Sequence, residues 1–271
     1  MSHERPIIHP TAQIANNVTF GPYTVIGPNV TIGEGTVIGS HVVIQENTRI
    51  GKHNHIHQFA SIGGHPQHAH YKGEQTFVEI GDHNTIREFC TINRGIADEH
   101  GSITRLGHGN FLMSYVHIAH NCTVGNHTIF ANNASIAGHV VVDDYVVLSG
   151  FAIVHQFCYI GAYSFLRAGT AVPRDIMPYI MVNGRPTQPC GLNTVGLKRR
   201  GFSSETISQL KKAYRLLFLS SKKLKEAREE IELMAKTTPE LTRWVEAIDR
   251  SERSITRPSG ENRLFEEAEL M

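Results

Sequence analysis

The sequence predicts an all-β fold, a parallel solenoid, that is followed by a C-terminal α-helical domain. Large apolar residues recur at a constant spacing of six from Ile8 to Val172, and this spacing indicates an internal repeat of short strands. The repeat then ends in a stretch with four prolines between 173 and 189, and helical spacing of apolar residues begins near Ser203. We therefore place the solenoid over residues 1–190 and the helical domain over 191–253.

Each repeat unit is expected to form a strand and a corner. The residues that lead the units are all large and apolar: Ile8, Ile14, Phe20, Ile26, Ile32, Ile38, Ile44, Ile50, Ile56, Ile62, Ile80, Ile86, Ile92, Leu106, Leu112, Ile118, Val124, Phe130, Ile136, Val142, Leu148, Val154, Ile160, Leu166 and Val172. Glycine often follows the lead residue, and Asn or Gly often lies two positions further on, as at Asn29 and Gly35. Because these residues tolerate positive φ angles, we expect a turn after each strand.

Two interruptions break the repeat, near 64–78 and near 94–105. The six-residue register resumes after each of them. Long loops that are ejected from a regular scaffold are more often functional than idle, so both are candidates for a site.

The C-terminal third carries three helix signals. Ser203 can cap a helix that runs to about Ser220, a second helix is expected over about 222–236, and Thr238-Pro239 opens a third that contains Trp244. Residues 254–271 contain a Pro-Ser-Gly sequence and a run of acidic residues, and we expect them to form a flexible tail.

Composition narrows the class of protein. The net charge of +1 gives no sign of a nucleic-acid partner. The N-terminus has no apolar signal region, and the most apolar window, 140–154, is interrupted by Asp143 and Asp144, so we expect no stable membrane insertion.

The cysteines give no sign of a metal site. Cys90, Cys122 and Cys158 share a repeat position that is held elsewhere by small residues, and none of the four cysteines has zinc-type pair spacing. We interpret them as buried, inert thiols of a cytoplasmic protein.

The repeat resembles the hexapeptide-repeat family. That resemblance implies a left-handed parallel β-helix with three hexads in each triangular coil, and it implies packing as a homotrimer. The left hand runs against the usual right-handed crossover rule, so it comes from the resemblance and not from the periodicity. A solenoid on its own would also leave flat, partly apolar faces exposed, which favours association.

A coil of three hexads brings several histidines together. Positions one coil apart stack at about 4.8 Å, so the hexads led by Ile118, Ile136 and Val154 become three successive rungs of one face. His120, His139, and His155 with Gln156 then form a polar column roughly 10 Å tall. His117 lies just before the base of this column.

Three interpretations of the column compete. The histidines can be exposed decoration, since the chain has 17 of them. They can bind zinc between subunits, as in carbonic anhydrases of the hexapeptide fold, with His117 and His120 as ligands. They can also supply a general base for acyl transfer.

Five motifs favour the third interpretation. They read HIAH at 117–120, ANNA at 131–134, AGHV at 137–140, VHQF at 154–157 and GLKRRGFS at 196–203. In this order, over nearly the full length, the chain resembles the UDP-N-acetylglucosamine 3-O-acyltransferase family of lipid A biosynthesis. The resemblance implies transfer of a 3-hydroxyacyl group from acyl carrier protein to the 3-hydroxyl of UDP-N-acetylglucosamine, with no metal and no bound organic cofactor.

The resemblance also implies residue roles. His120 becomes the general base, because an imidazole suits deprotonation of a sugar hydroxyl near neutral pH. The Gly138 backbone N–H becomes a donor to the oxyanion, and Ala168 limits the length of the acyl chain. Because Ala168 is small, we expect a relatively long hydroxyacyl chain to fit. The expected substrate-binding residues are Gln67, His68, His70, His117, His139, His155, Gln156, Asn193, Arg199 and Arg200, of which the arginines suit phosphate.

Two departures from the family pattern affect this site. The first loop reads Gln-His-Ala-His-Tyr at 67–71, where the family has Gln-Asp-x-Lys-Tyr, so two titratable rings replace an acceptor and a fixed cation. Asn121 follows His120, where the family often has Asp, so the base is expected to receive less electrostatic support.

Partners and rival functions follow from the same pattern. Acyl carrier protein is acidic, and the helical domain offers a set of cations for it: Lys211, Lys212, Arg215, Lys222, Lys223 and Lys225.

Other functions remain as alternatives. The enzymatic alternatives are acylation of a 3-amino sugar nucleotide, or the activity of another hexapeptide N-acyltransferase. The alternative from a different class is a structural solenoid without catalysis.

Overall fold

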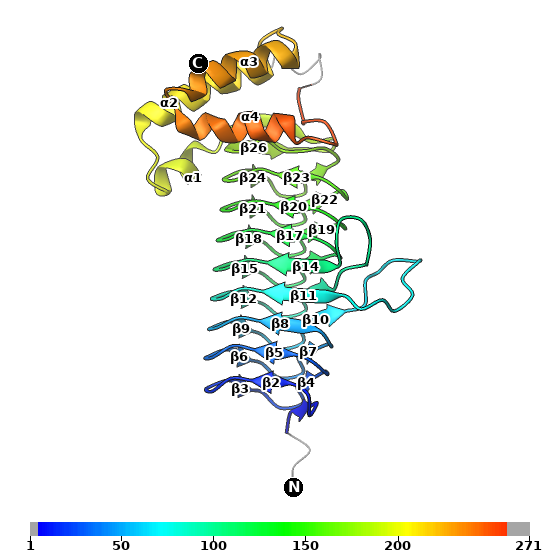
Figure 1. The fold of residues 1–271 in the computed structure, drawn as a ribbon. Helices are drawn as coiled ribbons and strands as arrows, with labels where there is room; N and C mark the ends of the chain where they lie inside the picture. Colours follow the sequence, from blue (N-terminus) through cyan, green and yellow to red (C-terminus); the bar gives the residue numbers. More distant parts are fainter. Residues whose placement is uncertain (1–4, 259–271) are drawn as a thin grey trace.

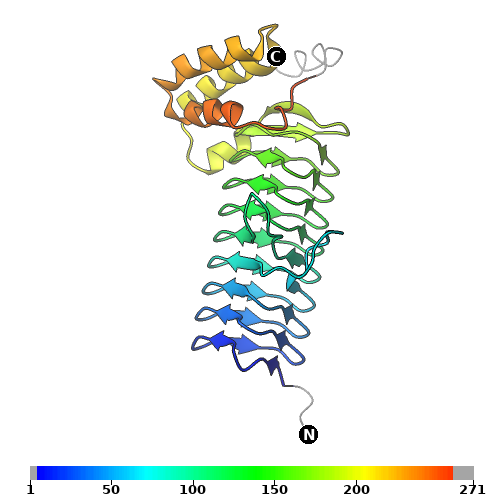
Figure 2. The same ribbon diagram turned by 45° about the vertical axis from the view of Figure 1, so that its right-hand side comes forward.

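The computed structural model describes residues 5–258 as a left-handed parallel β-helix with helices at its C-terminal end (Figure 1). The prism has three faces, each formed by one sheet of very short strands. Figure 2 shows the helices stacked over the last coils, at the opposite end from the N-terminus. Among the described residues, no helix is long and apolar enough to span a membrane.

The three sheets follow one another around the prism. The first sheet contains β1 (Ile7–Ile8), β4 (Val25–Ile26), β7 (Val43–Ile44), β10 (Ser61–Gly64), β13 (Thr91–Asn93), β16 (His117–Ile118), β19 (Ser135–Ile136), β22 (Ile153–Val154) and β25 (Ala171–Val172). The second sheet contains β2 (Gln13–Ile14), β5 (Thr31–Ile32), β8 (Thr48–Ile50), β11 (Phe77–Ile80), β14 (Ile103–Leu106), β17 (Thr123–Val124), β20 (Val141–Val142) and β23 (Tyr159–Ile160). The third sheet contains β3 (Thr19–Phe20), β6 (Val37–Ile38), β9 (His55–Ile56), β12 (Thr85–Ile86), β15 (Phe111–Leu112), β18 (Ile129–Phe130), β21 (Val147–Leu148), β24 (Phe165–Leu166), β26 (Ile180–Asn183) and β27 (Gln188–Leu192).

The lead residues of the repeat stack on one another in the interior. Ile118 pairs with Ile136, and Ile136 pairs with Val154, so the predicted three rungs are confirmed. Both isoleucines are fully buried. The register therefore turns a sequence period into one continuous apolar core.

Both interruptions leave the prism at one corner, between the first and second sheets. The first loop, 65–76, joins β10 to β11, and the second loop, 94–102, joins β13 to β14. Figure 1 shows both loops projecting from the same side. They leave from the two coils that precede His120, which places them beside the histidine column.

The corner residues with positive φ are often aromatic. The sequence favoured Asn and Gly at this position, yet Tyr23 (φ 59°), Phe89 (φ 61°) and Tyr115 (φ 64°) also adopt the left-handed conformation. Rings one coil apart lie face to face, with 4.9 Å between the Phe89 and Tyr115 centroids. Stacking between these rings offsets the free-energy cost of a positive φ angle at a residue that has a side chain.

The last coil is closed by a hairpin and by helices. β27 pairs antiparallel with β26, and it is followed by α1 (Thr194–Arg199), α2 (Ser204–Tyr214), the π-helix η1 (Arg215–Leu219), α3 (Leu224–Ala235), the 3-10 helix η2 (Pro239–Leu241) and α4 (Thr242–Asp249). The predicted Ser203 cap is confirmed, because its side chain accepts a hydrogen bond from the Thr206 N–H. α1 was not predicted, since it is short and contains glycine.

The start of the expected tail is held against the last coil. Ile255 forms a bridge with Asp175, and the Thr256 N–H donates to the Asp175 carbonyl at 2.8 Å. The remainder of the expected tail, 259–271, lies outside the described residues, as do residues 1–4.

Trp244 joins the helical domain to the prism. Its side chain is fully buried, and its indole N–H donates to the Pro178 carbonyl at 3.0 Å.

Replacement of a buried tryptophan by alanine costs about 3–5 kcal/mol of folding free energy. We therefore predict that Trp244→Ala lowers the denaturation midpoint of the helical signal in circular dichroism. Trp244→Phe, which keeps most of the packing, is expected to cost only about 1 kcal/mol. Equal midpoints for the parent and Trp244→Ala would contradict this role.

Candidate active site

Three histidine rings meet where the ejected loops reach the prism. His120 lies at the corner between β16 and β17, and His139 lies one coil further on, between β19 and β20. Their ring centroids are 5.2 Å apart and nearly perpendicular, and the His68 ring from the first loop lies 5.4 Å from His120. Two of the sequence-predicted residues of the column, together with one from the first loop, thus share one site.

Asn121 fixes the orientation of the His120 ring. Its amide nitrogen donates to the carbonyls of Ile96 (3.0 Å) and Gly101 (3.1 Å), and its amide oxygen accepts from the Ile96 N–H (2.7 Å). The amide oxygen is also 3.2 Å from His120 Nδ1. Because this oxygen can only accept, Nδ1 of the neutral ring carries the proton and Nε2 carries the lone pair.

The departure at Asn121 therefore has a structural reason. A carboxylate has no N–H, so it could not donate to the two carbonyls of the second loop that the Asn121 amide binds.

Burial lowers the pKa of His120 below its usual value, and the Asn121 hydrogen bond opposes this only in part. The ring is consequently neutral at pH 7, which is the form that accepts a proton.

Gly138 lies directly against the imidazole of His120. A Cβ at position 138 would be 2.5 Å from His120 Cε1 and 2.6 Å from Nε2, so only glycine leaves room for the ring. In the same repeat position elsewhere, the N–H groups of Lys52 and Asn126 donate to carboxylates of Asp82 and Asp144 on the neighbouring coil. At those two positions the N–H group is therefore directed along the prism, toward the next coil. Within residues 5–258, the Gly138 N–H has no such partner.

His139 is held by residues that the sequence analysis missed. Asp98 Oδ2 lies 3.3 Å from His139 Nε2, and the His100 ring packs edge-on at 5.4 Å. The other face of the His139 ring stacks on Phe157 at 4.5 Å. Burial lowers the pKa of His139, although the Asp98 charge raises it in part. The only sequence signal for Asp98 and His100 was their place in an ejected loop.

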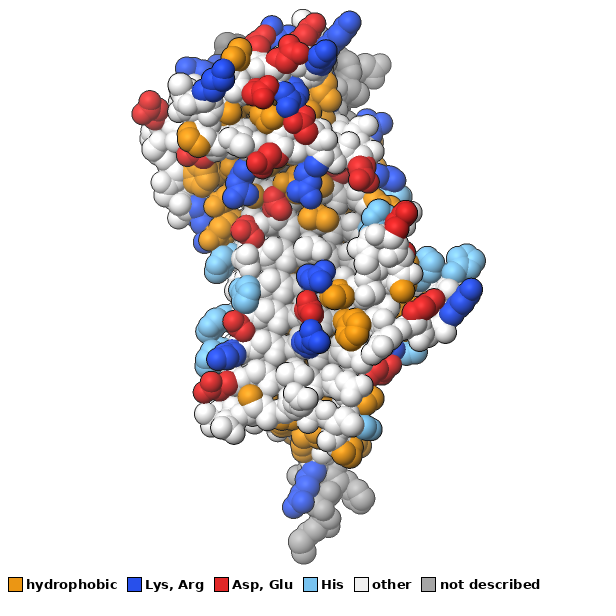
Figure 3. All heavy atoms as spheres, viewed as in Figure 1, with side chains coloured by type: hydrophobic (Ala, Val, Ile, Leu, Met, Phe, Trp, Pro, Cys, Tyr) orange, Lys and Arg blue, Asp and Glu red, His pale blue; other side chains and the backbone are white. Residues whose placement is uncertain are grey.

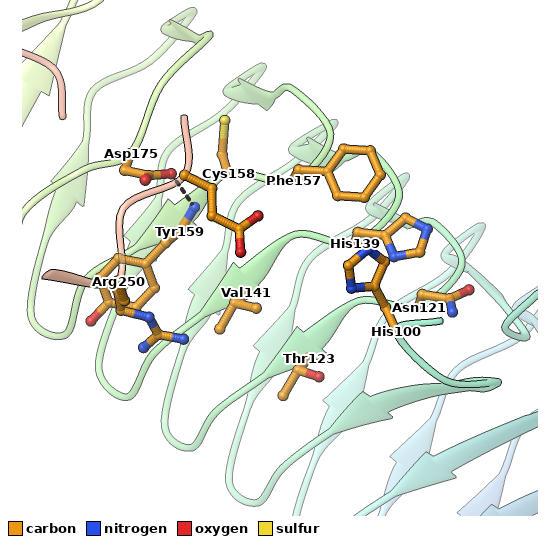
Figure 4. A pocket seen from close by; sticks show the side chains of 11 residues that line it. His100, Asn121, Thr123, His139, Val141, Phe157, Cys158, Tyr159, Asp175 and Arg250 are labelled. Carbon is orange, nitrogen blue, oxygen red and sulfur yellow. Dashed lines mark hydrogen bonds between the residues drawn. The ribbon is translucent and has the colours of Figure 1, made fainter. Parts of the chain in front are cut away.

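A cavity of about 340 Å³ opens beside His139. Figure 4 shows His100, His139 and Phe157 at one end and Tyr159, Asp175 and Arg250 at the other. The floor is formed by the second sheet, and the walls come from the second loop and from the segment after α4.

The other predicted residues of the column lie above and below this centre. His117 Nδ1 is 2.7 Å from the Thr91 hydroxyl, and burial lowers the pKa of His117. His155 Nδ1 is 3.1 Å from the Arg253 guanidinium, which comes from the segment after α4. Gln156 is exposed on the same corner.

Two predicted residues at the nucleotide end do not reach the column within one chain. Arg200 lies 4.5 Å above the Tyr145 ring, and Tyr145 follows β20 whereas His139 precedes it. Asn193 donates to the Tyr163 carbonyl and caps α1 through Gly196. Both are therefore one prism corner away from His139. Arg199 is exposed at the end of α1, and Gln67 and His70 are exposed on the first loop.

An apolar cavity of about 430 Å³ lies on the first face near the C-terminal end. Its walls include Ile153, His155, Ala171 and Pro186. Ala168 is exposed at the corner that leads into β25. Among the described residues of one chain, no three His, Cys, Asp or Glu side chains group as a metal ion requires.

Comparison with known proteins identifies the family. Residues 175–256 match the family model for the second domain of UDP-N-acetylglucosamine O-acyltransferase, and 11–46, 29–64 and 103–138 match the bacterial transferase hexapeptide model. The acyl-[acyl-carrier-protein]–UDP-N-acetylglucosamine O-acyltransferase of Thiobacillus denitrificans is 48% identical over 94% of this chain and 98% of its own length. The chain belongs to the UDP-N-acetylglucosamine O-acyltransferase family.

Further relatives agree in sequence and in structure. The acyl-[acyl-carrier-protein]–UDP-N-acetylglucosamine O-acyltransferase of Alkalilimnicola ehrlichii is 51% identical over 93% of this chain and 98% of its own length. The crystal structure of the UDP-N-acetylglucosamine acyltransferase of Francisella novicida superposes with a TM-score of 0.92 at 43% identity, covering 95% of this chain and 94% of that one. The chain is accordingly an O-acyltransferase with the β-helix and helical domain of this family.

The contact between Gly138 and His120 gives a prediction. Gly138→Ala is expected to push the His120 ring aside and to lower acyltransferase turnover by at least about 100-fold, the low end for lost acid–base catalysis. The fold is expected to survive, because Gly138 has no positive φ. Gly150→Ala is the matched control, since Gly150 holds the same repeat position and its nearest atom to a new Cβ is 3.4 Å away. Parental turnover in Gly138→Ala would contradict the arrangement.

Proposed function

We propose that the chain transfers a 3-hydroxyacyl group from acyl carrier protein to the 3-hydroxyl of UDP-N-acetylglucosamine, the first step of lipid A biosynthesis. The observation that carries this proposal is a neutral, buried His120 whose ring packs directly against the backbone of Gly138. A base and an oxyanion donor beside each other are what acyl transfer to an alcohol requires.

The reaction uses these two groups in sequence. His120 Nε2 takes the proton of the sugar hydroxyl as its oxygen attacks the thioester carbonyl. The Gly138 N–H donates to the oxyanion that forms, and the imidazolium then returns its proton to the departing thiolate of the carrier. The proton taken from the sugar hydroxyl thus ends on the thiol of the carrier, and His120 is neutral again at the end of the cycle.

The remaining predicted residues are proposed to bind substrate. His117, His139, His155 and Gln156 line the column along which the sugar nucleotide lies. Gln67, His68 and His70 cover it from the first loop, and the 5.4 Å contact of the His68 ring with His120 supports this placement.

A homotrimer would complete the site. Asn193, Arg199 and Arg200 are proposed to reach the nucleotide that is bound at the column of a neighbouring copy, because within one chain they lie at another corner. Exposed rings also favour association: Phe59, Phe89, Tyr115 and Phe151 are 42–62% exposed at the corner between the third and first sheets.

Acyl carrier protein is proposed to dock on the helical domain. The cationic side chains of this domain are interspersed with acidic ones (Figure 3), and Lys222 pairs with Glu230. Lys211, Lys212, Arg215, Lys223 and Lys225 are left for an acidic partner. The substrates and the buried free thiols of Cys90, Cys122 and Cys158 support a cytoplasmic site of action.

Product analysis tests this function. The purified chain, supplied with a panel of hydroxyacyl carrier proteins, is expected to give a 3-O-acyl product from UDP-N-acetylglucosamine in mass spectrometry. Acylation of only the 3-amino analogue would replace this proposal with the N-acyl alternative. No product from either acceptor, together with no binding of a uridine nucleotide, would favour the structural solenoid.

The role of His120 gives a second prediction. His120→Ala is expected to lower turnover by at least about 100-fold, since the hydroxyl loses its base. His108→Ala is the matched control, because His108 occupies the same repeat position at another corner and is exposed. Steady-state turnover of the two variants decides the matter, and near-parental turnover of His120→Ala would refute the assignment.

Ala168 gives a third prediction, on acyl-chain length. The lining of the apolar cavity on the first face includes Ala171, three residues after Ala168. We propose that the acyl groove extends from this cavity to Ala168, so a larger side chain there is expected to shorten it. Each buried methylene contributes about 0.8 kcal/mol, so Ala168→Met should shift preference toward shorter donors by several-fold per carbon while keeping activity on them. Competition assays with a series of acyl donors measure this. An unchanged ranking would rule out Ala168 as the ruler.

A further inference from the structure

The second ejected loop presents a carboxylate to a ring of the histidine column. Asp98 Oδ2 is 3.3 Å from His139 Nε2, and the His139 side chain is only 8% exposed. The mechanism above gives Asp98 no role. A buried pairing of this kind needs an account, because the loop leaves the regular scaffold to make it.

The loop is held so that Asp98 has one position. Asp98 and Gly101 exchange two backbone hydrogen bonds of 3.1 Å, and the other carboxylate oxygen of Asp98 accepts from the His100 N–H at 2.9 Å. The Asn121 amide holds Ile96 and Gly101 from below. The carboxylate is therefore fixed at both the backbone and the side chain before substrate arrives.

This pairing decides which nitrogen of His139 can accept a hydrogen bond. A carboxylate only accepts, so Nε2 of the neutral ring carries the proton and Nδ1 carries the lone pair. Within residues 5–258, Nδ1 has no hydrogen-bond partner and is not among the fully buried polar atoms that are left unpaired. His139 also lines the cavity of about 340 Å³, from which a ligand could approach the ring. An open acceptor at this height of the column suits a hydroxyl or an amide N–H.

We propose that Asp98 is a positioning residue: by fixing the proton of His139 on Nε2, it makes Nδ1 a hydrogen-bond acceptor for a hydroxyl or acetamido N–H of the sugar nucleotide. The proposal rests on the proposed function, since it names a contact to the same substrate. Asp98 acts only through His139 and touches no reacting atom.

The pH dependence of binding follows from the groups around the ring. Burial lowers the pKa of His139, the charge of Asp98 opposes this in part, and the rings of His120, His100 and His68 lower the pKa further. Protonated His139 has no acceptor, so the contact is lost as pH falls through its pKa. Loss of the Asp98 charge lowers that pKa further. The acid-side loss of binding should then move to lower pH.

The test measures the binding of UDP-N-acetylglucosamine by calorimetry across pH, and turnover alongside it. Asp98→Ala removes both the charge and the acceptor that face His139 Nε2, and it is expected to weaken binding about 3- to 10-fold near pH 8, the worth of one hydrogen bond, with kcat within about twofold. Its acid limb should lie at lower pH than that of the parent. His100→Ala is the control, since it removes ring packing on His139 but keeps the Asp98 contact.

A double-mutant cycle shows that the effect passes through His139. In a His139→Ala background, Asp98→Ala should have no further effect on binding. Parental affinity and an unmoved acid limb in Asp98→Ala would overturn the inference, and so would equal losses with and without His139. Failure of the unaltered chain to bind the sugar nucleotide would instead overturn the proposed function.

Discussion

The parallel stacking of coils is the constraint on which the rest of the structure depends. Each strand is only two to four residues long in the three sheets, apart from β27, so no strand is stable alone. Hydrogen bonds to the coils above and below, with a lead residue such as Ile136 turned inward, supply the stability. Because every coil repeats this geometry, a residue at a given repeat position lies directly over its counterpart in the next coil.

That constraint builds the site from distant parts of the sequence. His120 and His139 are neighbours because they hold nearly the same place on adjacent coils, and the two ejected loops reach them because both leave at the same corner. Gly138 shows how tight the arrangement is, since any side chain there would occupy the space of the His120 ring. Asn121 connects the two features, because its side chain contacts both the second loop and the His120 ring.

The repeat made the β-helix, its two interruptions and the stacked histidines predictable from sequence, because six-residue spacing and coil register translate directly into position. The same reasoning could not find Asp98 or His100, since a loop outside the register has no periodic geometry. It also missed the stacked aromatic corners, because single-residue φ preferences favour Asn and Gly and say nothing about a ring one coil away. The 3.3 Å pairing of Asp98 with His139 could be seen only once the loop was folded over the column.

The central proposal is that His120 of one copy works with the cations of another. The direct measurement mixes His120→Ala with Arg200→Ala, each of which is expected to have little activity alone, by unfolding and refolding them together. Random reassembly into rings with one site per interface would restore about a quarter of parental acyl transfer to UDP-N-acetylglucosamine, because half of the columns and half of the cationic ends are intact. Such recovery is the result that our account predicts. A mixture no more active than its separate components would contradict it.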